Sequence, residues 1–306
     1  MDVSLRQLRY FVAAAEAGTI AGAAAREHLS QSTVALAISE LERALGVQLF
    51  LRRQAKGLTI TQAGLAVLAD ARPLLAHADE LVYSARSLGG QLSGDLIIGC
   101  YTTLAPFLMP GVLEGFATEH PRVRLRFVEG SQVELQERLV DGSCEIALLY
   151  DLDLQPGVHH EALYHTRPHV LLPRAHALVR DDPVSLRDLA DEPMIMLDYP
   201  PSRHYFTQLL ESLELRPVIH HTTSSFETVR SLVARGLGYS LLIQQPACDV
   251  SYEGLPLADC AIREDVPKMP VLLAWPARAK LTRRAKAFVD FCHQTLASGP
   301  VQPGPW

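Results

Sequence analysis

Apolar side chains recur every three or four residues in three short stretches at the start of the chain, the spacing of amphipathic helices. The first stretch covers residues 5–17, Thr19 can cap a second helix over residues 20–28, and Ser30 can cap a third over residues 31–45. On the third helix we expect Val34, Ile38, Leu41 and Leu45 to face inward. Small side chains in the second stretch let two helices cross over a tight turn, which predicts a helix-turn-helix.

Residues 47–61 alternate well enough to predict a β-hairpin that turns near Lys56-Gly57 and stands beside the helices as a wing. The start of a recognition helix reaches base edges and phosphates. From the third helix we expect DNA contacts by Ser30, Gln31, Ser32, Thr33, Ala35, Leu36 and Ser39. From the hairpin we expect Arg52, Arg53 and Lys56 to contact phosphates, which position a protein without reading sequence.

A long helix is predicted from Thr61 to about Gly89. Large apolar residues recur every seven positions at Val67, Leu74, Leu81 and Leu88, and small ones recur four further on at Ala71, Ala78 and Ala85. This heptad pattern is typical of a helix that pairs with the same helix of a second copy. The alternative is a helix packed only on its own domain.

From Gly94 onward, short apolar runs alternate with amphipathic stretches. We expect strands at 95–100, 123–129, 144–150, 169–173, 193–197, 217–222, 238–243 and 269–276, and helices at 104–118, 133–140, 202–213, 226–235 and 281–296. The strand-helix-strand order favours a parallel sheet with right-handed crossovers. Two α/β lobes that the chain crosses between twice indicate a fold of the type II periplasmic-binding-protein kind.

Ligands of open α/β sheets bind beyond the carboxyl ends of the strands. The candidate effector-binding residues are therefore Cys100, Tyr101, Thr102, Thr103, Ser131, Ser202, Arg203, His204, Ser225, Phe226 and Gln244. Hydroxyl groups at a helix N-terminus suit a carboxylate, although Thr103 and the serines could serve only as helix caps. Arg203 follows a Pro-Pro turn, from which it could meet the charge of a ligand.

Metal and redox chemistry receive little support. His159, His160, His165, His169 and the pair His220-His221 are expected to be surface histidines, because neighbouring strand residues face opposite ways. The five cysteines lack metal-ligand spacing, and only Cys100 has a position that suits a redox role. No cofactor and no metal are expected.

Charge is unevenly distributed along the chain. The whole chain carries −6, but residues 1–64 hold seven Lys/Arg and five Asp/Glu, which gives +2 and leaves −8 for the remainder. A mildly basic N-terminal segment joined to an acidic remainder suits a protein that contacts DNA only through its N-terminal segment. No apolar run is long enough to cross a bilayer and no signal stretch opens the chain, so we expect a cytoplasmic protein without membrane contact.

The first 64 residues resemble the DNA-binding domain of the LysR-type transcriptional regulators. The matching positions include Phe11, Gly18, Ala23-Ala24, Ser30-Gln31, Val34, Leu41-Glu42, Leu45-Gly46, Leu49-Phe50, Arg52, Thr61 and Gly64. Looser matches to the family's effector domain are residues 94–100, 145–150 and 232–242. The chain departs from the family at Ser32, where Pro is usual, and at Ala35-Leu36, where Ser-Arg is usual. Thymine methyl contacts or DNA shape would then replace the missing arginine.

The resemblance implies a winged helix-turn-helix over residues 1–61, a dimerisation helix over 62–92 and an effector domain over 93–300. Lobe I of that domain would comprise about 93–164 and 269–300, and lobe II about 165–268. The expected function is sequence-specific transcriptional regulation, controlled by a polar or anionic small molecule. Expected partners are an operator duplex, this effector, further copies in a dimer or tetramer, and RNA polymerase if the protein activates.

Two alternatives to this function stay open. One is a redox-sensing regulator of the same family that acts through Cys100, and the other is a solute-binding protein that does not bind DNA. An enzyme is not expected, because the sequence has no phosphate-binding glycine loop, nucleophile elbow or paired catalytic carboxylates.

Overall fold

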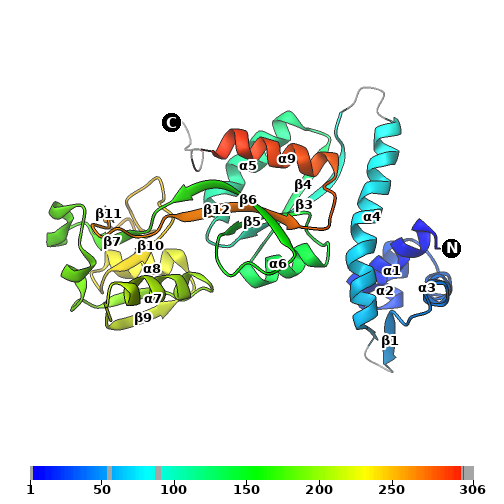
Figure 1. Ribbon diagram of the computed structural model, residues 1–306, viewed down its shortest axis with the longest axis horizontal. Coiled ribbons are helices and arrows are strands. Elements are labelled where there is room, and N and C mark those ends of the chain that lie inside the picture. Colours follow the sequence, from blue (N-terminus) through cyan, green and yellow to red (C-terminus); the bar gives the residue numbers. More distant parts are fainter. Residues whose placement is uncertain (1–2, 54–56, 87–90, 298, 300–306) are drawn as a thin grey trace.

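The structure is a computed structural model that describes residues 3–53, 57–86, 91–297 and 299. The molecule is elongated, with the N-terminal helices at one end and two α/β lobes following one another toward the other end (Figure 1). This arrangement confirms the predicted fold class: a winged helix-turn-helix, a long helix and a two-lobed α/β domain.

The N-terminal unit consists of α1 (Leu5–Ala17), α2 (Ile20–Arg26), α3 (Gln31–Leu45), β1 (Phe50–Arg53) and β2 (Gly57–Ile60). The predicted caps are confirmed, because Thr19 accepts from the amide of Gly22 and Ser30 from that of Thr33. The second helix is shorter than expected, since His28 takes a φ of 56° that no α-helix continues.

The buried face of α3 is smaller than predicted. Val34, Ile38 and Leu41 are buried, as expected, but Leu45 is 38% exposed. Gly46, at a φ of 71°, ends the helix directly after Leu45, so this leucine lies in the last turn. The expectation that Leu45 faces inward was therefore wrong.

The long helix α4 (Gln62–Arg86) presents two different faces. Leu68, Ala71 and Leu75 are buried in the core of the N-terminal unit. On other faces Leu65, Leu74, Leu81 and Val82 are between 41% and 72% exposed. Leu68, Ala71 and Leu75 thus pack on the helix's own domain, whereas Leu74 and Leu81 of the heptad pattern form a stripe that is open to solvent. Leu65 lies on the opposite side of the helix from Leu74. Leu88 of that pattern lies outside the described residues.

Lobe I is built on a five-stranded sheet in the order β4-β3-β5-β12-β6. The strands are β3 (Gly94–Tyr101), β4 (Val123–Gly130), β5 (Ile146–Tyr150), β6 (Val158–Thr166) and β12 (Met269–Pro276), and the helices are α5 (Ala105–Glu119), α6 (Gln132–Val140) and α9 (Arg283–Leu296). The predicted parallel arrangement holds for β4, β3 and β5. β12 and β6 are antiparallel, so the sheet is mixed, and β6 was not predicted.

Lobe II contains two smaller sheets, β10-β7-β11 and β8-β9. Its elements are β7 (His169–Pro173), 3-10 turns at Ala177–Asp181 and Leu186–Leu189, β8 (Met194–Leu197), α7 (Ser202–Ser212), β9 (Ile219–Thr223), α8 (Phe226–Ala234), β10 (Ser240–Leu242) and β11 (Leu257–Ala261). The chain enters lobe II between β6 and β7 and returns between β11 and β12.

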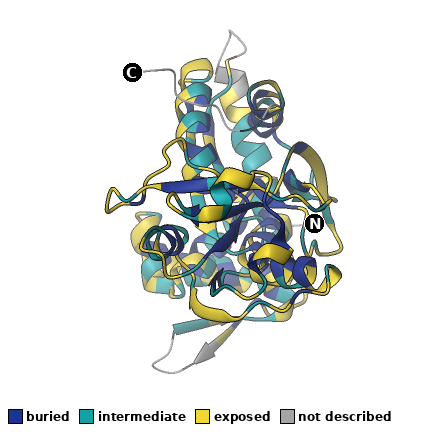
Figure 2. Ribbon diagram, turned by 90° about the vertical axis from the view of Figure 1, so that its left-hand side faces the viewer, coloured by how far each residue is buried: buried dark blue, intermediate teal, exposed yellow. Residues whose placement is uncertain are grey.

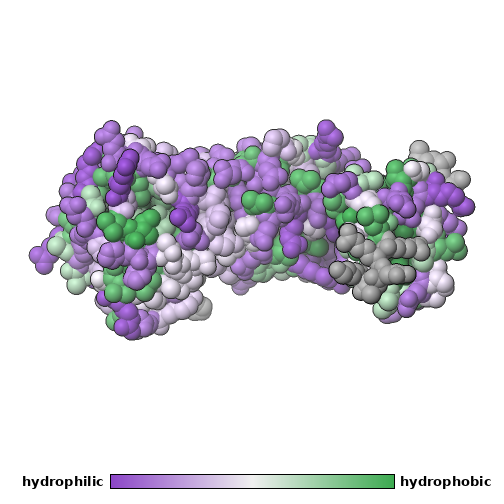
Figure 3. All heavy atoms as spheres, turned by 90° about the horizontal axis from the view of Figure 1, so that it is seen from below, coloured by the Kyte–Doolittle hydropathy of each residue, from purple (hydrophilic) through white to green (hydrophobic). Residues whose placement is uncertain are grey.

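Buried residues follow the central strands, while the outer helix faces are exposed (Figure 2). Seen from below, the surface is mostly hydrophilic, with small apolar patches that include both ends of the molecule (Figure 3). Among the described residues no helix combines the length and hydropathy needed to span a membrane.

Candidate functional site

The first turn of α3 exposes a row of hydroxyl groups. Ser30 Oγ lies 2.8 Å from both Ser32 Oγ and Thr33 Oγ1, and it accepts from the backbone amide of Thr33 at 3.2 Å. Capping fixes these side chains at the helix N-terminus, whose partial positive charge favours phosphate. The turn can therefore receive a DNA backbone.

The rest of the predicted recognition face is also accessible. Ser30, Gln31, Ser32, Thr33 and Ser39 are exposed, Leu36 is 62% exposed, and Ala35 is half-buried. An isolated leucine that projects from a polar helix face gains no burial within its own domain, and its methyl groups suit the C5-methyl of thymine.

The wing is fixed to α3 by the carboxylate of Glu42. Its Oε1 accepts from the amides of Leu49 at 2.8 Å and Phe50 at 3.2 Å, directly ahead of and within β1. At the other strand, Gly57 has a φ of 76°, and a Cβ there would lie 2.6 Å from the carbonyl oxygen of Gly18. The predicted contacts Arg52 and Arg53 lie on β1, whereas Lys56 lies outside the described residues.

The two lobes meet at the carboxyl end of β3. Tyr101 donates from its hydroxyl to the Pro200 carbonyl at 3.1 Å and lies 3.1 Å from Ser202 Oγ. The Thr102 hydroxyl lies 3.0 Å from that of Tyr199. These bonds connect lobe I to the segment that begins α7 in lobe II.

A small cavity lies beside these contacts. It is lined by Thr103, Tyr150, Leu197, Ser202, Phe206, Phe226, Leu242, Ile243 and Gln244. Its volume is about 10 Å³, close to the minimum that holds one water molecule. Four predicted residues thus come together: Thr103, Ser202, Phe226 and Gln244.

Sequence reasoning missed Tyr150, whose hydroxyl accepts from Gln244 Nε2 at 2.9 Å across the lobes. Its position was a usable signal, because it ends the third parallel strand at the edge that receives ligands. Burial raises the pKa of the Tyr101 and Tyr150 hydroxyls well above their ordinary range. Both groups therefore remain neutral hydrogen-bonding groups.

The other predicted effector residues do not line this cavity. Ser131 and Ser225 cap α6 and α8, the alternative role considered for them. Arg203 is exposed, and its Nη1 lies 3.1 Å from both carboxylate oxygens of Asp198. His204 is exposed. A ligand contact by any of these side chains stays a prediction.

Cys100 lies in the core of lobe I and is fully buried. Desolvation, followed by the charges of Glu129 and Cys292, raises the pKa of its thiol far above the ordinary value. The thiolate is the reactive form of cysteine. This environment therefore disfavours the redox role that its sequence position suggested.

The histidine prediction was wrong for His169, which is 3% exposed and has Nε2 3.1 Å from a carboxylate oxygen of Asp259. His159, His160, His165, His220 and His221 are exposed, as predicted. Within the described part of the chain, no group of three or more His, Cys, Asp or Glu side chains could hold a metal ion.

Comparison with known proteins identifies both parts of the chain. Residues 5–65 match the model of the bacterial regulatory helix-turn-helix protein, lysR family, and residues 89–297 match that of the LysR substrate binding domain. The chain belongs to the LysR family of transcriptional regulators. This LysR-family protein is a DNA-binding regulator with an effector-binding domain, and its family membership confirms that it is not an enzyme.

Individual relatives cover nearly the whole LysR-family chain. It is 30% identical to the uncharacterized HTH-type transcriptional regulator YnfL of Escherichia coli, over 94% of this chain and 97% of that protein. The solved structure of HinK, a LysR family transcriptional regulator from Pseudomonas aeruginosa, is 38% identical with a TM-score of 0.65, covering 96% and 98% of the two chains. Full-length OxyR from the same organism is 26% identical with a TM-score of 0.75, covering 95% and 97%.

Proposed function

We propose that this protein changes its operator binding, or its activation of transcription, when a small polar or anionic organic molecule binds between the two lobes. The observation that carries the proposal is the convergence of Thr103, Ser202 and Gln244 on one inter-lobe cavity. These neutral donors come from both lobes, so a molecule bound there would contact both at once.

The nature of this effector follows from the surroundings of the cavity. The side chains that line it are hydroxyl, amide, aromatic or aliphatic groups, without a charged residue among the described ones. The first turns of α5 and α7 carry no side-chain cap. A carboxylate could therefore be bound by hydroxyl groups and helix N-termini, as such groups bind anions elsewhere.

The lobes have to separate before the effector enters. A cavity of about 10 Å³ is far smaller than the pockets that enclose small organic molecules. The ring centroids of Phe107 and Phe226, one from each lobe, are 5.6 Å apart. Effector binding that opens the lobes would change their relative placement, and with it the contacts between copies.

We further propose that α4 pairs through its exposed apolar face with α4 of a second copy to form a homodimer. Effector domains of two dimers would associate to form a tetramer, and RNA polymerase would be a partner if the protein activates transcription. Apolar side chains gathered on one solvent-facing stripe of a long helix favour pairing with another helix. Sedimentation of the full chain measures the assembly directly.

The test of the main proposal is a gel-shift titration of the full chain on the DNA upstream of its own gene, with small organic acids screened for a change. We expect salt-sensitive binding. Ser202→Ala should reduce the effector-dependent change about tenfold, since it removes one buried hydrogen bond, and leave basal binding intact. Arg203→Ala is the comparison variant. If its effector-dependent change in DNA binding equals that of the parent, Arg203 pairs with Asp198 and does not contact the effector. Failure to bind any duplex would instead favour a solute-binding protein.

A further inference from the structure

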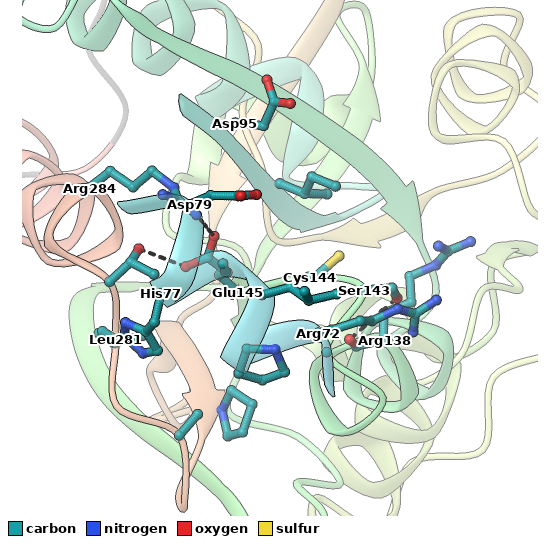
Figure 4. A pocket seen from close by; sticks show the side chains of 18 of the residues that line it. Arg72, His77, Asp79, Asp95, Arg138, Ser143, Cys144, Glu145, Leu281 and Arg284 are labelled. Carbon is teal, nitrogen blue, oxygen red and sulfur yellow. Dashed lines mark hydrogen bonds and ion pairs between the residues drawn. The ribbon is translucent and has the colours of Figure 1, made fainter. Parts of the chain in front are cut away.

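A second and larger cavity lies where α4 meets α1 and lobe I (Figure 4). Its volume is about 470 Å³, the size of pockets that hold small organic molecules. Its walls come from α1, from α4, and from lobe I segments around residues 142–145 and 276–284. Among the described residues, none that lines the inter-lobe cavity also lines this one.

Much of the wall is apolar. Pro73, Leu75 and Ala76 contribute from α4, and Ile97 and Leu281 contribute from lobe I. Burial of hydrocarbon against such side chains stabilises a complex in proportion to the area removed from water. The cavity therefore suits a molecule with an apolar body.

The charged side chains that line the cavity balance, with four carboxylates against four Arg or Lys side chains, but they are not all paired with one another. The carboxylates that line it are already paired: Glu16 with Arg72, Asp79 with Arg9, Asp95 with Arg124, and Glu145 with Arg284. Arg138 and Lys280 also line it, and neither has a carboxylate within 4.0 Å in the described ranges of the chain. An anion that approached these two cations would not have to displace a carboxylate already paired with either of them.

Two buried donors strengthen the case. The Nε atoms of Arg72 and Arg284 are buried and have no hydrogen-bond partner among the described residues. The Arg284 side chain is only 5% exposed, and Figure 4 shows it extending to Glu145 at the cavity. Because a buried N–H without an acceptor costs free energy, an oxyanion that reached it would be stabilised.

We propose that this junction cavity is a second ligand site, which binds a small organic anion with an aromatic or aliphatic body. Arg72 makes the site sensitive to domain placement. Its guanidinium contacts Glu16 of α1 at 3.4 Å and the Asp141 carboxylate, which follows α6, at 3.0 Å. A ligand beside Arg72 would therefore bias how α4 sits on lobe I, and so how the DNA-binding domain is presented.

The experiment titrates the full chain with the fluorescent anion anilinonaphthalene sulfonate, which brightens in apolar surroundings. We expect one saturable site per chain. Ala76→Trp fills the cavity and should weaken probe binding at least about tenfold. The matched control is Ala66→Trp, on an exposed position of α4 that does not line the cavity, and it should bind as the parent does.

Charge is tested separately, with substitutions of exposed residues that do not endanger folding. Arg138→Ala combined with Lys280→Ala should weaken the probe about threefold, as expected for two solvent-screened charges, whereas Lys286→Ala should not. In the parent chain, saturating probe should also change operator affinity about fivefold, the lower end of typical allosteric coupling.

Three results would overturn the proposal. They are full probe binding by Ala76→Trp, equal binding of uncharged phenylnaphthylamine by the parent, and loss of the probe site in Ser202→Ala, which would place the probe in the inter-lobe cavity. An operator affinity that does not respond to bound probe would reject the coupling to DNA.

Discussion

The phenol oxygen of Tyr101 lies 3.1 Å from Oγ of Ser202, which joins the end of β3 in lobe I to the first residue of α7 in lobe II. Both residues are buried, at 0% and 2% exposure. Since the same phenol donates to the Pro200 carbonyl, this side chain makes two of the hydrogen bonds that join the lobes beside the proposed effector site.

Tyr101→Phe is expected to lower the free energy of unfolding by about 1–2 kcal/mol, because it leaves buried polar groups without a partner. Urea denaturation measures the change. The matched control is Tyr252→Phe, at a side chain that is 90% exposed and should change stability little. Equal stability of the parent and Tyr101→Phe would show that this inter-lobe bond contributes nothing.

Gln31→Ala should weaken operator binding by about 1–3 kcal/mol without changing stability, because an exposed glutamine at the start of a recognition helix can pair with an adenine edge. Fluorescence anisotropy on the operator provides the measurement. Gln208→Ala, at an exposed position of α7, is the control. If both variants bind alike, Gln31 does not touch a base.

Glu42→Ala removes the acceptor of the Leu49 and Phe50 amides, so the wing loses its attachment to α3. We expect a loss of about 1–3 kcal/mol in stability, together with weaker DNA binding. Glu42→Gln keeps a carbonyl oxygen at the same position and should recover most of both. Hydrogen exchange at the two amides reports the bond directly, and unchanged exchange in Glu42→Ala would contradict this role.

Ellman's reagent at pH 8 should label Cys248 quickly and the other four thiols slowly, because Cys248 is exposed and the rest are buried.

Burial raises the pKa of Cys144 from 9.0 to about 11 in the folded state. The folded chain then holds this proton more tightly, so stability falls as the pH rises above about 9. Fast labelling of Cys100 in the native chain would restore the redox alternative.

Local rules made the DNA-binding unit predictable from the sequence. Ser4, Thr19 and Ser30 each accept from the amide three residues along the chain, and such bonds depend only on nearby residues. The burial of Val34, Ile38 and Leu41 on one face of α3 follows from their helical spacing.

The effector half was harder to predict, because its decisive contacts join distant segments. β6 was not predicted because most of its first five residues are exposed and polar. A bulge opposite Val271–Leu272 also interrupts the alternation of buried and exposed side chains along this strand. Arg203 looked free to meet a ligand, but Asp198, five residues before it, supplies a nearer partner. The exact composition of the cavity depends on Tyr150 and Gln244 meeting across 94 positions of sequence.

Arg72 has a consequence for the geometry of a complex on DNA. Arg72 on α4 pairs with Glu16 of α1 and with Asp141 of lobe I. These two ion pairs restrain the DNA-binding domain from rotating relative to lobe I within a single subunit. The separation between two half-sites that a dimer can occupy would then be dictated by how whole subunits are arranged. Regulation would act as a choice between operators of different half-site separation, one helical turn apart or several.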